Sequence, residues 1–98
     1  MVRTWAILLF AISFANQIAA QPYTISGYVE ERGSGEKLIG AHVYEMNSEN
    51  GTVTNDYGYF SLKVPQKEAI LRVSFVGYEP AFDTLTLKGD RKINYQLD

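Results

Sequence analysis

The segment from Gly51 to Pro65 constrains the fold of this chain more than any other. It reads Gly-Thr-Val-Thr-Asn-Asp-Tyr-Gly-Tyr-Phe-Ser-Leu-Lys-Val-Pro, so a polar, glycine-punctuated turn precedes a strictly alternating run. Successive side chains of a strand point to opposite faces, which places Phe60, Leu62 and Val64 on one face. The pattern predicts a turn and a strand of a half-buried antiparallel sheet.

Short runs rich in Thr, Tyr, Val and Ile recur along the rest of the chain, separated by turn residues. No segment after residue 20 shows the i, i+3, i+4, i+7 spacing of an amphipathic helix. The pattern favours an all-β, seven-stranded antiparallel β-sandwich, with a small closed barrel as the alternative. The predicted strands are residues 23–30, 38–46, 52–54, 59–64, 69–75, 82–87 and 92–97.

The N-terminus is typical of a secretory signal peptide. Arg3 precedes an apolar run over 5–15, and small residues follow up to Ala20. We therefore predict a cleavable helical signal peptide over 1–20 and one exported domain over 21–98. A transmembrane anchor is the alternative, disfavoured because the apolar run ends at Asn16, well short of about 20 residues. The chain has no cysteine, which excludes disulfides and a lipid-modified cysteine.

The charge pattern excludes one class of partner. Cleavage removes Arg3 and leaves eight of the nine basic residues against eleven acidic ones. These charges form no basic stripe and no run of like charge, so nucleic acid is not an expected partner.

Four segments, in order, carry a family resemblance. They are Ile-x-Gly-x-Val from Ile25, Leu-x-Gly-Ala-x-Val from Leu38, the Gly51–Pro65 segment, and Leu-x-x-Ser-Phe-x-Gly-Tyr from Leu71. Their order and spacing resemble the carboxypeptidase-regulatory-like domain, a transthyretin-like (prealbumin-like) β-sandwich with Ig-like architecture. In particular, the chain resembles the version at the N-terminus of TonB-dependent, SusC-like outer-membrane receptors of Bacteroidetes. The resemblance covers 23–98.

The chain departs from the family pattern at two turn positions. Asn55 stands where the family commonly has Asp, and Lys37 stands where it commonly has Pro. Both are mild changes of turn chemistry and leave the resemblance intact.

The resemblance implies a non-enzymatic module at the periplasmic face of the outer membrane. Its expected partners are a receptor plug and barrel or an associated lipoprotein, in the uptake of nutrients such as glycans. A membrane barrel needs at least eight strands, so we expect a stand-alone module or the leading part of a truncated receptor. The alternative is a stand-alone secreted or periplasmic module that binds carbohydrate or protein.

Exposed aromatic side chains are the candidate interaction surface. Such side chains stack on sugars or on partner proteins, but tyrosine is also favoured in strands because it packs across neighbouring strands. Structural packing is the preferred interpretation and a binding platform the alternative. The two edge strands of the sandwich are further candidates for accepting a partner strand. The five tyrosines concerned are Tyr28, Tyr44, Tyr57, Tyr59 and Tyr78.

Catalytic and metal sites are not expected. His42 is the only histidine, and a hydrolytic triad of Ser74, His42 and Asp56 lacks a nucleophile-elbow sequence. Asn55 and Asp56 are too few oxygen ligands for calcium and are predicted to form a hydrogen-bonded turn. We therefore predict no catalytic residue, no cofactor and no metal.

Two glycines are predicted to matter for packing. Gly27 and Gly40 lack a β-carbon, which allows a neighbouring strand or a large ring to approach the backbone closely.

Overall fold

The computed structural model describes residues 22–98, so the predicted signal peptide over 1–20 lies outside the described residues. Every regular element from residue 22 onward is a strand. This part of the chain contains no helix with the length and apolar character needed to cross a membrane. The strands are β1 (Tyr23–Glu31), β2 (His42–Glu45), β3 (Gly51–Val53), β4 (Tyr59–Val64), β5 (Glu68–Ser74), β6 (Ala81–Thr86), β7 (Arg91–Lys92) and β8 (Tyr95–Leu97).

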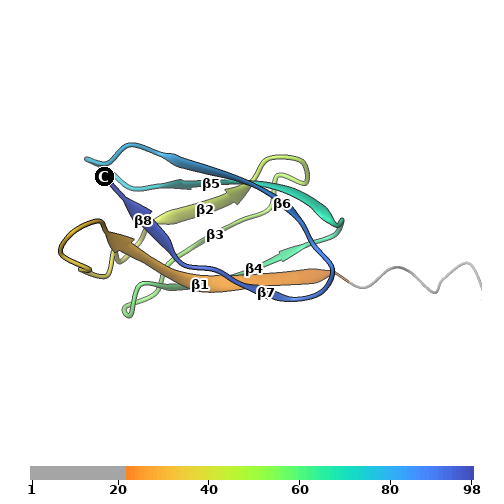
Figure 1. Cartoon of the computed structure of the whole chain (residues 1–98), viewed down its shortest axis with the longest axis horizontal. Coiled ribbons are helices and arrows are strands. Elements are labelled where there is room, and N and C mark those ends of the chain that lie inside the picture. The colour runs from red at the N-terminus through yellow and green to blue at the C-terminus, as the bar shows by residue number, and fades with distance from the viewer. Residues whose placement is uncertain (1–21) are drawn as a thin grey trace, which may run out of the picture.

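The strands form two four-stranded sheets that pack face to face (Figure 1). In the first sheet, β1 lies between β4 on one side and β7 and β8 on the other. In the second sheet the order is β3-β2-β5-β6, with every neighbouring pair antiparallel. The predicted all-β sandwich is confirmed.

Two details of the strands differ from the prediction. Ile93 and Asn94 interrupt the predicted strand 92–97, which leaves β7 and β8, and both run parallel to β1 instead of antiparallel. The predicted strand 38–46 begins only at His42, because Gly40 has a φ of 81° and turns the chain there. A β-carbon on Gly40 would meet nothing within 4 Å, so backbone conformation, and not a close approach, explains this glycine.

The core lies between the two sheets and follows the predicted alternation. Phe60, Leu62 and Val64 are buried, as expected for one face of β4. The same period places Leu71 and Val73 of β5 on the opposite wall. The buried apolar residues are Ile25, Val29, Leu38, Ala41, Val43, Phe60, Leu62, Val64, Ala69, Leu71, Val73, Leu85, Leu87, Tyr95 and Leu97.

The turn before β4 is built by the residues that the sequence indicated. The Oδ1 atom of Asn55 accepts hydrogen bonds from the backbone N–H groups of Tyr57 at 2.9 Å and Tyr59 at 3.1 Å. Gly58 has a φ of 74°, a conformation that favours glycine. The predicted turn-forming role of Asn55 and Gly58 is confirmed.

Gly27 lies where the C-terminal part of the chain passes close to the backbone of β1. A β-carbon at this position would lie 1.8 Å from the carbonyl oxygen of Ile93. The N–H of Ile93 donates to the carbonyl of Ser26 at 2.8 Å, so the segment between β7 and β8 is hydrogen-bonded to β1 beside Gly27. The predicted close approach at Gly27 is confirmed, and the approaching group is backbone.

Glu45 is a carboxylate buried inside the domain, with no exposed surface. Its Oε1 atom accepts from the N–H of Ser48 at 2.6 Å and from Nε2 of Gln66 at 2.9 Å. Its Oε2 atom accepts from the N–H groups of Ile70 at 2.8 Å and Asn47 at 3.1 Å. One side chain thus ties the end of β2 to the turn that follows it and to β5.

The hydrogen bonds decide the ionisation of Glu45. Burial raises the pKa of this carboxyl, but the N–H donors of Ile70, Ser48 and Asn47 outweigh burial and lower the pKa from 4.5 to about 2. The folded state therefore binds this proton more weakly than the unfolded chain does. The contribution of Glu45 to stability is complete above a pH of about 4.5 and is lost as the pH falls toward 2.

Replacement of Gly27 by alanine should unfold or strongly destabilise the domain. The added β-carbon displaces the backbone of Ile93, and we expect a loss of at least about 3 kcal/mol in the free energy of unfolding. Urea denaturation monitored by tyrosine fluorescence measures the change. The matched control is Gly89→Ala, because a β-carbon on Gly89 meets nothing within 4 Å. Equal stability of the two variants would contradict the close crossing.

Replacement of Glu45 by glutamine should lower the free energy of unfolding at pH 7 by about 2–3 kcal/mol. The side-chain NH₂ group of glutamine would face backbone N–H groups, which are donors as well, so hydrogen bonds are lost. The substitution also removes the negative charge that these N–H groups stabilise. The difference from the wild type should shrink as the pH falls from 5 toward 2, because the wild-type carboxyl is then protonated. Glu49→Gln, an exposed glutamate of the same turn, is the control. A difference that stays constant over this pH range would contradict the assignment.

Candidate functional site

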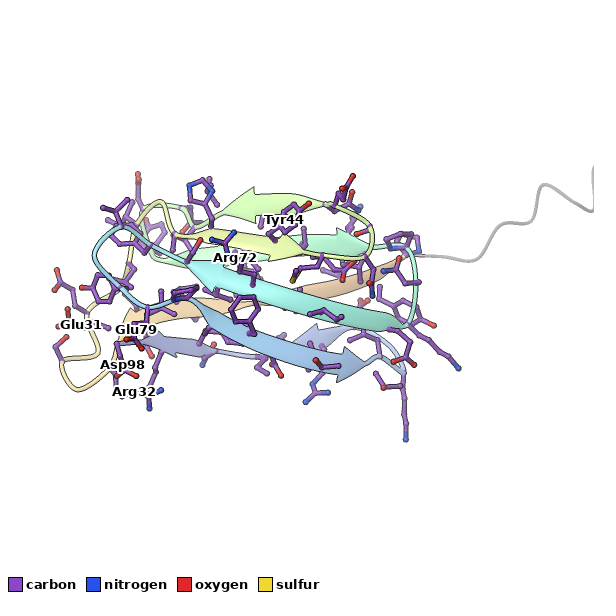
Figure 2. All side chains as sticks on the ribbon, turned by 90° about the horizontal axis from the view of Figure 1, so that it is seen from above. Glu31, Arg32, Tyr44, Arg72, Glu79 and Asp98 are labelled. Carbon is purple, nitrogen blue, oxygen red and sulfur yellow. The ribbon has the colours of Figure 1, made fainter. Side chains whose placement is uncertain are left out.

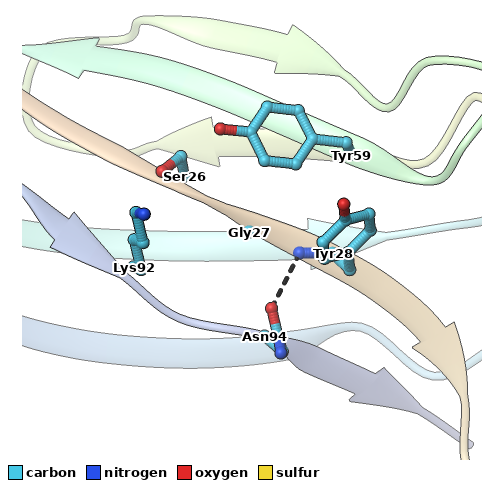
Figure 3. A pocket seen from close by; sticks show the side chains of 6 residues that line it. All are labelled: Ser26, Gly27, Tyr28, Tyr59, Lys92 and Asn94. Atoms are coloured by element: carbon cyan, nitrogen blue, oxygen red, sulfur yellow. Dashed lines mark hydrogen bonds between the residues drawn. The ribbon is translucent and has the colours of Figure 1, made fainter.

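A hollow of about 340 Å³ lies on the outer face of the first sheet (Figure 3). Strand β1 forms its floor, while Tyr59 comes from β4 and Lys92 from β7. Asn94 comes from the segment that links β7 to β8. The lining residues are Ser26, Gly27, Tyr28, Tyr59, Lys92 and Asn94.

The aromatic wall of this hollow is a cross-strand pair. Tyr28 and Tyr59 are register partners in the β1–β4 ladder, so both side chains point to the same outer face. Their ring centroids are 5.3 Å apart, with an edge-to-face angle of 65°. The Nζ atom of Lys37 lies 4.6 Å from the centroid of Tyr28 and also pairs with Glu30. Tyr28 therefore packs against neighbours and still exposes 37% of its surface.

Side-chain hydrogen bonds add to the short β7 and β8 ladders that hold the C-terminal wall against β1. The Oδ1 atom of Asn94 accepts from the N–H of Tyr28 at 3.0 Å, and Oδ1 of Asp90 accepts from the N–H of Thr24 at 2.9 Å. Because Asn94 uses its carbonyl oxygen in this way, its amide NH₂ group is left for other acceptors. The hollow thus offers aromatic edges, an amide donor and the ammonium group of Lys92.

The other predicted tyrosines lie elsewhere on the sandwich. Tyr44 is half-buried on β2, in the second sheet, and Tyr57 is 75% exposed in the turn before β4. Tyr78 follows β5 and packs edge-to-face on Phe75, with ring centroids 5.8 Å apart. The structure brings Tyr28 and Tyr59 together, while Tyr44 lies in the opposite sheet.

Tyr78 is hydrogen-bonded to Glu31, at the end of the sandwich where Figure 2 shows Glu31, Arg32 and Asp98 close to one another. Its hydroxyl donates to Oε2 of Glu31, and Oε1 of the same carboxylate accepts from the hydroxyl of Ser34 at 2.8 Å. These two hydrogen bonds lower the pKa of Glu31, and the bond to Glu31 raises the pKa of Tyr78. Beside them, the Arg32 guanidinium pairs with Asp98 at 2.8 Å. These contacts connect the end of β1 to Tyr78 and to the C-terminal residue, which indicates a structural role for the cluster.

The residues considered for catalysis do not assemble into a triad. His42 and Ser74 are register partners on β2 and β5, whereas Asp56 lies in the exposed turn before β4. No side-chain hydrogen bond within residues 22–98 joins His42 to Ser74 or to Asp56, so the only link between His42 and Ser74 is the backbone pairing of β2 with β5. This part of the chain also holds no group of three or more His, Cys, Asp or Glu residues placed to bind a metal.

The sequence interpretation missed several polar residues that the structure makes important. Glu45, Lys92 and Asn94 carried no motif, because their roles depend on parallel pairing and on a turn packed against another strand. Tyr95 is a further case. Burial and the hydrogen bond from its hydroxyl to Asp83, 2.8 Å long, both raise its pKa.

Comparison with known proteins gives the family and a receptor relative. Residues 25–98 match the CarboxypepD_reg-like domain family. The chain is also 35% identical over 80 residues to the TonB-dependent receptor SusC of Bacteroides thetaiotaomicron. This alignment covers 82% of the chain and 8% of SusC, so the chain spans only a small part of that receptor's length.

Solved structures share the fold. Two interface mutants of a type II cohesin–X-dockerin complex from Acetivibrio cellulolyticus each contain a chain that superposes on this one, with TM-scores of 0.65 and 0.64. Both are 18% identical, and the match covers 74% of this chain and 52% of the other. At this identity the likeness shows the fold alone. The match over residues 25–98, with the sandwich fold that accompanies it, places this chain in the CarboxypepD_reg-like domain family.

Proposed function

We propose that this chain is a non-enzymatic module of the bacterial envelope that binds protein partners. In this proposal it is exported to the periplasm and acts as the N-terminal extension of a TonB-dependent receptor does, in nutrient or glycan uptake. The observation that carries the proposal is the 35% identity to SusC over 80 residues, together with the family match over residues 25–98. The partners proposed are a receptor plug and barrel or an associated lipoprotein.

The outer face of the second sheet supports such binding. Tyr44, Arg72 and Phe82 are successive register partners across β2, β5 and β6, so they form one row on this face. Figure 2 shows Tyr44 and Arg72 next to one another. Phe82 exposes 61% of its surface, and Arg72 is exposed. Aromatic residues and arginine are the types enriched where proteins bind one another.

The charge of this row indicates the chemistry of the partner. In the part of the chain that the structure describes, Arg72 has no carboxylate within 4.0 Å and donates no side-chain hydrogen bond. A guanidinium between two aromatic side chains is suited to a carboxylate or a carbonyl edge on an incoming protein. We therefore expect the partner surface to present an acidic residue to Arg72.

Photo-cross-linking from Tyr44 tests this proposal. With benzoylphenylalanine at Tyr44, irradiation of Bacteroides cells that produce the chain should yield an adduct with an outer-membrane receptor or lipoprotein. Arg72→Glu should reduce the adduct at least fivefold, about 1 kcal/mol of binding free energy. Mass spectrometry of the adduct identifies the partner.

The control for that experiment is Lys63→Glu, which makes the same charge change on β4 in the other sheet. This variant should leave the adduct unchanged. An equal loss in both variants, or adducts with cytoplasmic proteins only, would overturn the proposal.

The hollow at Tyr28 and Tyr59 favours a second candidate function, the binding of a glycan. Aromatic edges, the amide NH₂ group of Asn94 and an ammonium group are groups that hydroxyl-rich ligands contact, and the hollow brings them together. The two aromatic rings pack edge-to-face, and the ammonium group of Lys37 lies over the ring of Tyr28. We therefore expect a sugar to stack on the ring of Tyr59.

A titration of residues 22–98 with oligosaccharides tests the glycan candidate. Binding in the hollow should shift the backbone amide signals of Gly27, Tyr28 and Asn94 with a dissociation constant of about 1 mM. Tyr59→Ala should abolish the shifts, whereas Tyr57→Ala in the neighbouring turn should not. Unchanged spectra at about 10 mM ligand would remove this candidate.

A further inference from the structure

Strand β6 is an edge strand, and its outward backbone groups have no hydrogen-bond partner among residues 22–98. The N–H of Leu87 donates to the carbonyl of Lys67 at 2.7 Å, which fixes the phase of the β5–β6 ladder. In an antiparallel ladder the bonded residues alternate, so the odd-numbered residues of β6 bond to β5. The N–H and C=O groups of Phe82, Thr84 and Thr86 therefore point away from the sheet.

The other edges of the two sheets are protected. Strand β3 has only three residues, and β7 and β8 have two and three. Strand β4 is six residues long, but it carries Lys63, whose carbonyl accepts from Nδ2 of Asn50 at 3.0 Å. Edge strands are usually protected against pairing with another chain by being short, by carrying charged side chains or by being covered by other groups. Strand β6 also has six residues, and its outward-bonding residues are all exposed and uncharged.

We propose that β6 pairs with β6 of a second copy of this chain, antiparallel and centred on Thr84. A two-fold axis at Thr84 places Phe82 of one copy opposite Thr86 of the other, and the reverse. All three outward residues then exchange backbone hydrogen bonds with their counterparts, and the second sheets of the two copies join into one. This inference is independent of the proposed receptor function.

Charge complementarity favours a second copy as the occupant. In the register centred on Thr84, Lys88 of each copy lies opposite Pro80 and next to Glu79 of the other copy. Two pairs of opposite charge therefore flank the paired segment. The one charged residue of β6, Asp83, lies on the inner face, where its carboxylate accepts a hydrogen bond from the hydroxyl of Tyr95. The pairing also places the ring of Phe82 over the methyl group of Thr86 on the same outer face, a favourable cross-strand contact. The edge is thus complementary to itself in charge at both ends, and Phe82 packs on Thr86 between them.

A cysteine introduced at Thr84 tests the register. The chain has no native cysteine, so a short bismaleimide reacts at the introduced site alone. Residues 22–98 contain the whole core and all eight strands, so this segment serves as the protein. Thr84→Cys should form a covalent dimer at least tenfold faster than Ser61→Cys, an exposed site on β4.

The same reagent distinguishes this register from loose association. Phe82→Cys mixed with Thr86→Cys should form the mixed dimer faster than either variant forms its own, because these positions face one another across the two-fold axis. Equal cross-linking rates for cysteines at positions 61, 82, 84 and 86 would overturn the proposal. Faster cross-linking of Thr86→Cys with itself than with Phe82→Cys would also overturn it.

Sedimentation velocity provides a second and independent test. Residues 22–98 should show a concentration-dependent dimer at about 0.1–1 mM. Thr84→Pro removes one outward N–H and leaves the ladder with β5 intact, so it should abolish the dimer without loss of the circular dichroism of the sandwich. Thr84→Val keeps that N–H and should keep the dimer. A strict monomer over this range, with the edge free for a strand of another protein, would overturn the proposal.

Discussion

The close crossing of Ile93 over Gly27 is the contact on which the rest of the structure depends. Because Gly27 has no β-carbon, the carbonyl of Ile93 reaches the face of β1 and its N–H bonds to Ser26. The C-terminal segment can therefore run parallel along β1 in two short strands, β7 and β8. Strand β1 is therefore paired on both sides, and it forms the floor of the hollow between Tyr59 and Lys92.

Sequence alone predicted those parts of the fold that depend on local periodicity and turn chemistry. Phe60, Leu62 and Val64 alternate, and a half-buried strand is the arrangement that such a run satisfies best. Asn55 and Gly58 were interpretable as turn residues because their chemistry acts within four residues of chain. The all-β sandwich and the family follow from several such local patterns taken in order.

The remaining features depend on which segments meet in space. The split at Ile93 and Asn94 and the parallel pairing with β1 arise because one distant glycine admits the backbone there. Glu45 reads as an ordinary polar residue at a strand end, but three backbone N–H groups and Gln66 surround its carboxylate. The row of Tyr44, Arg72 and Phe82 appears only once β2, β5 and β6 are in register.

The central claim of this account is that β1 is held on both sides, by β4 and by the crossing C-terminal segment. Amide hydrogen exchange on residues 22–98, followed by NMR, tests it most directly because it reports the hydrogen bond of each N–H group. The account predicts that Thr24, Tyr28 and Ile93, whose partners lie across the crossing, exchange as slowly as Val29, which bonds to the β4 side. Fast exchange at Thr24, Tyr28 and Ile93 beside slow exchange at Val29 would contradict the account.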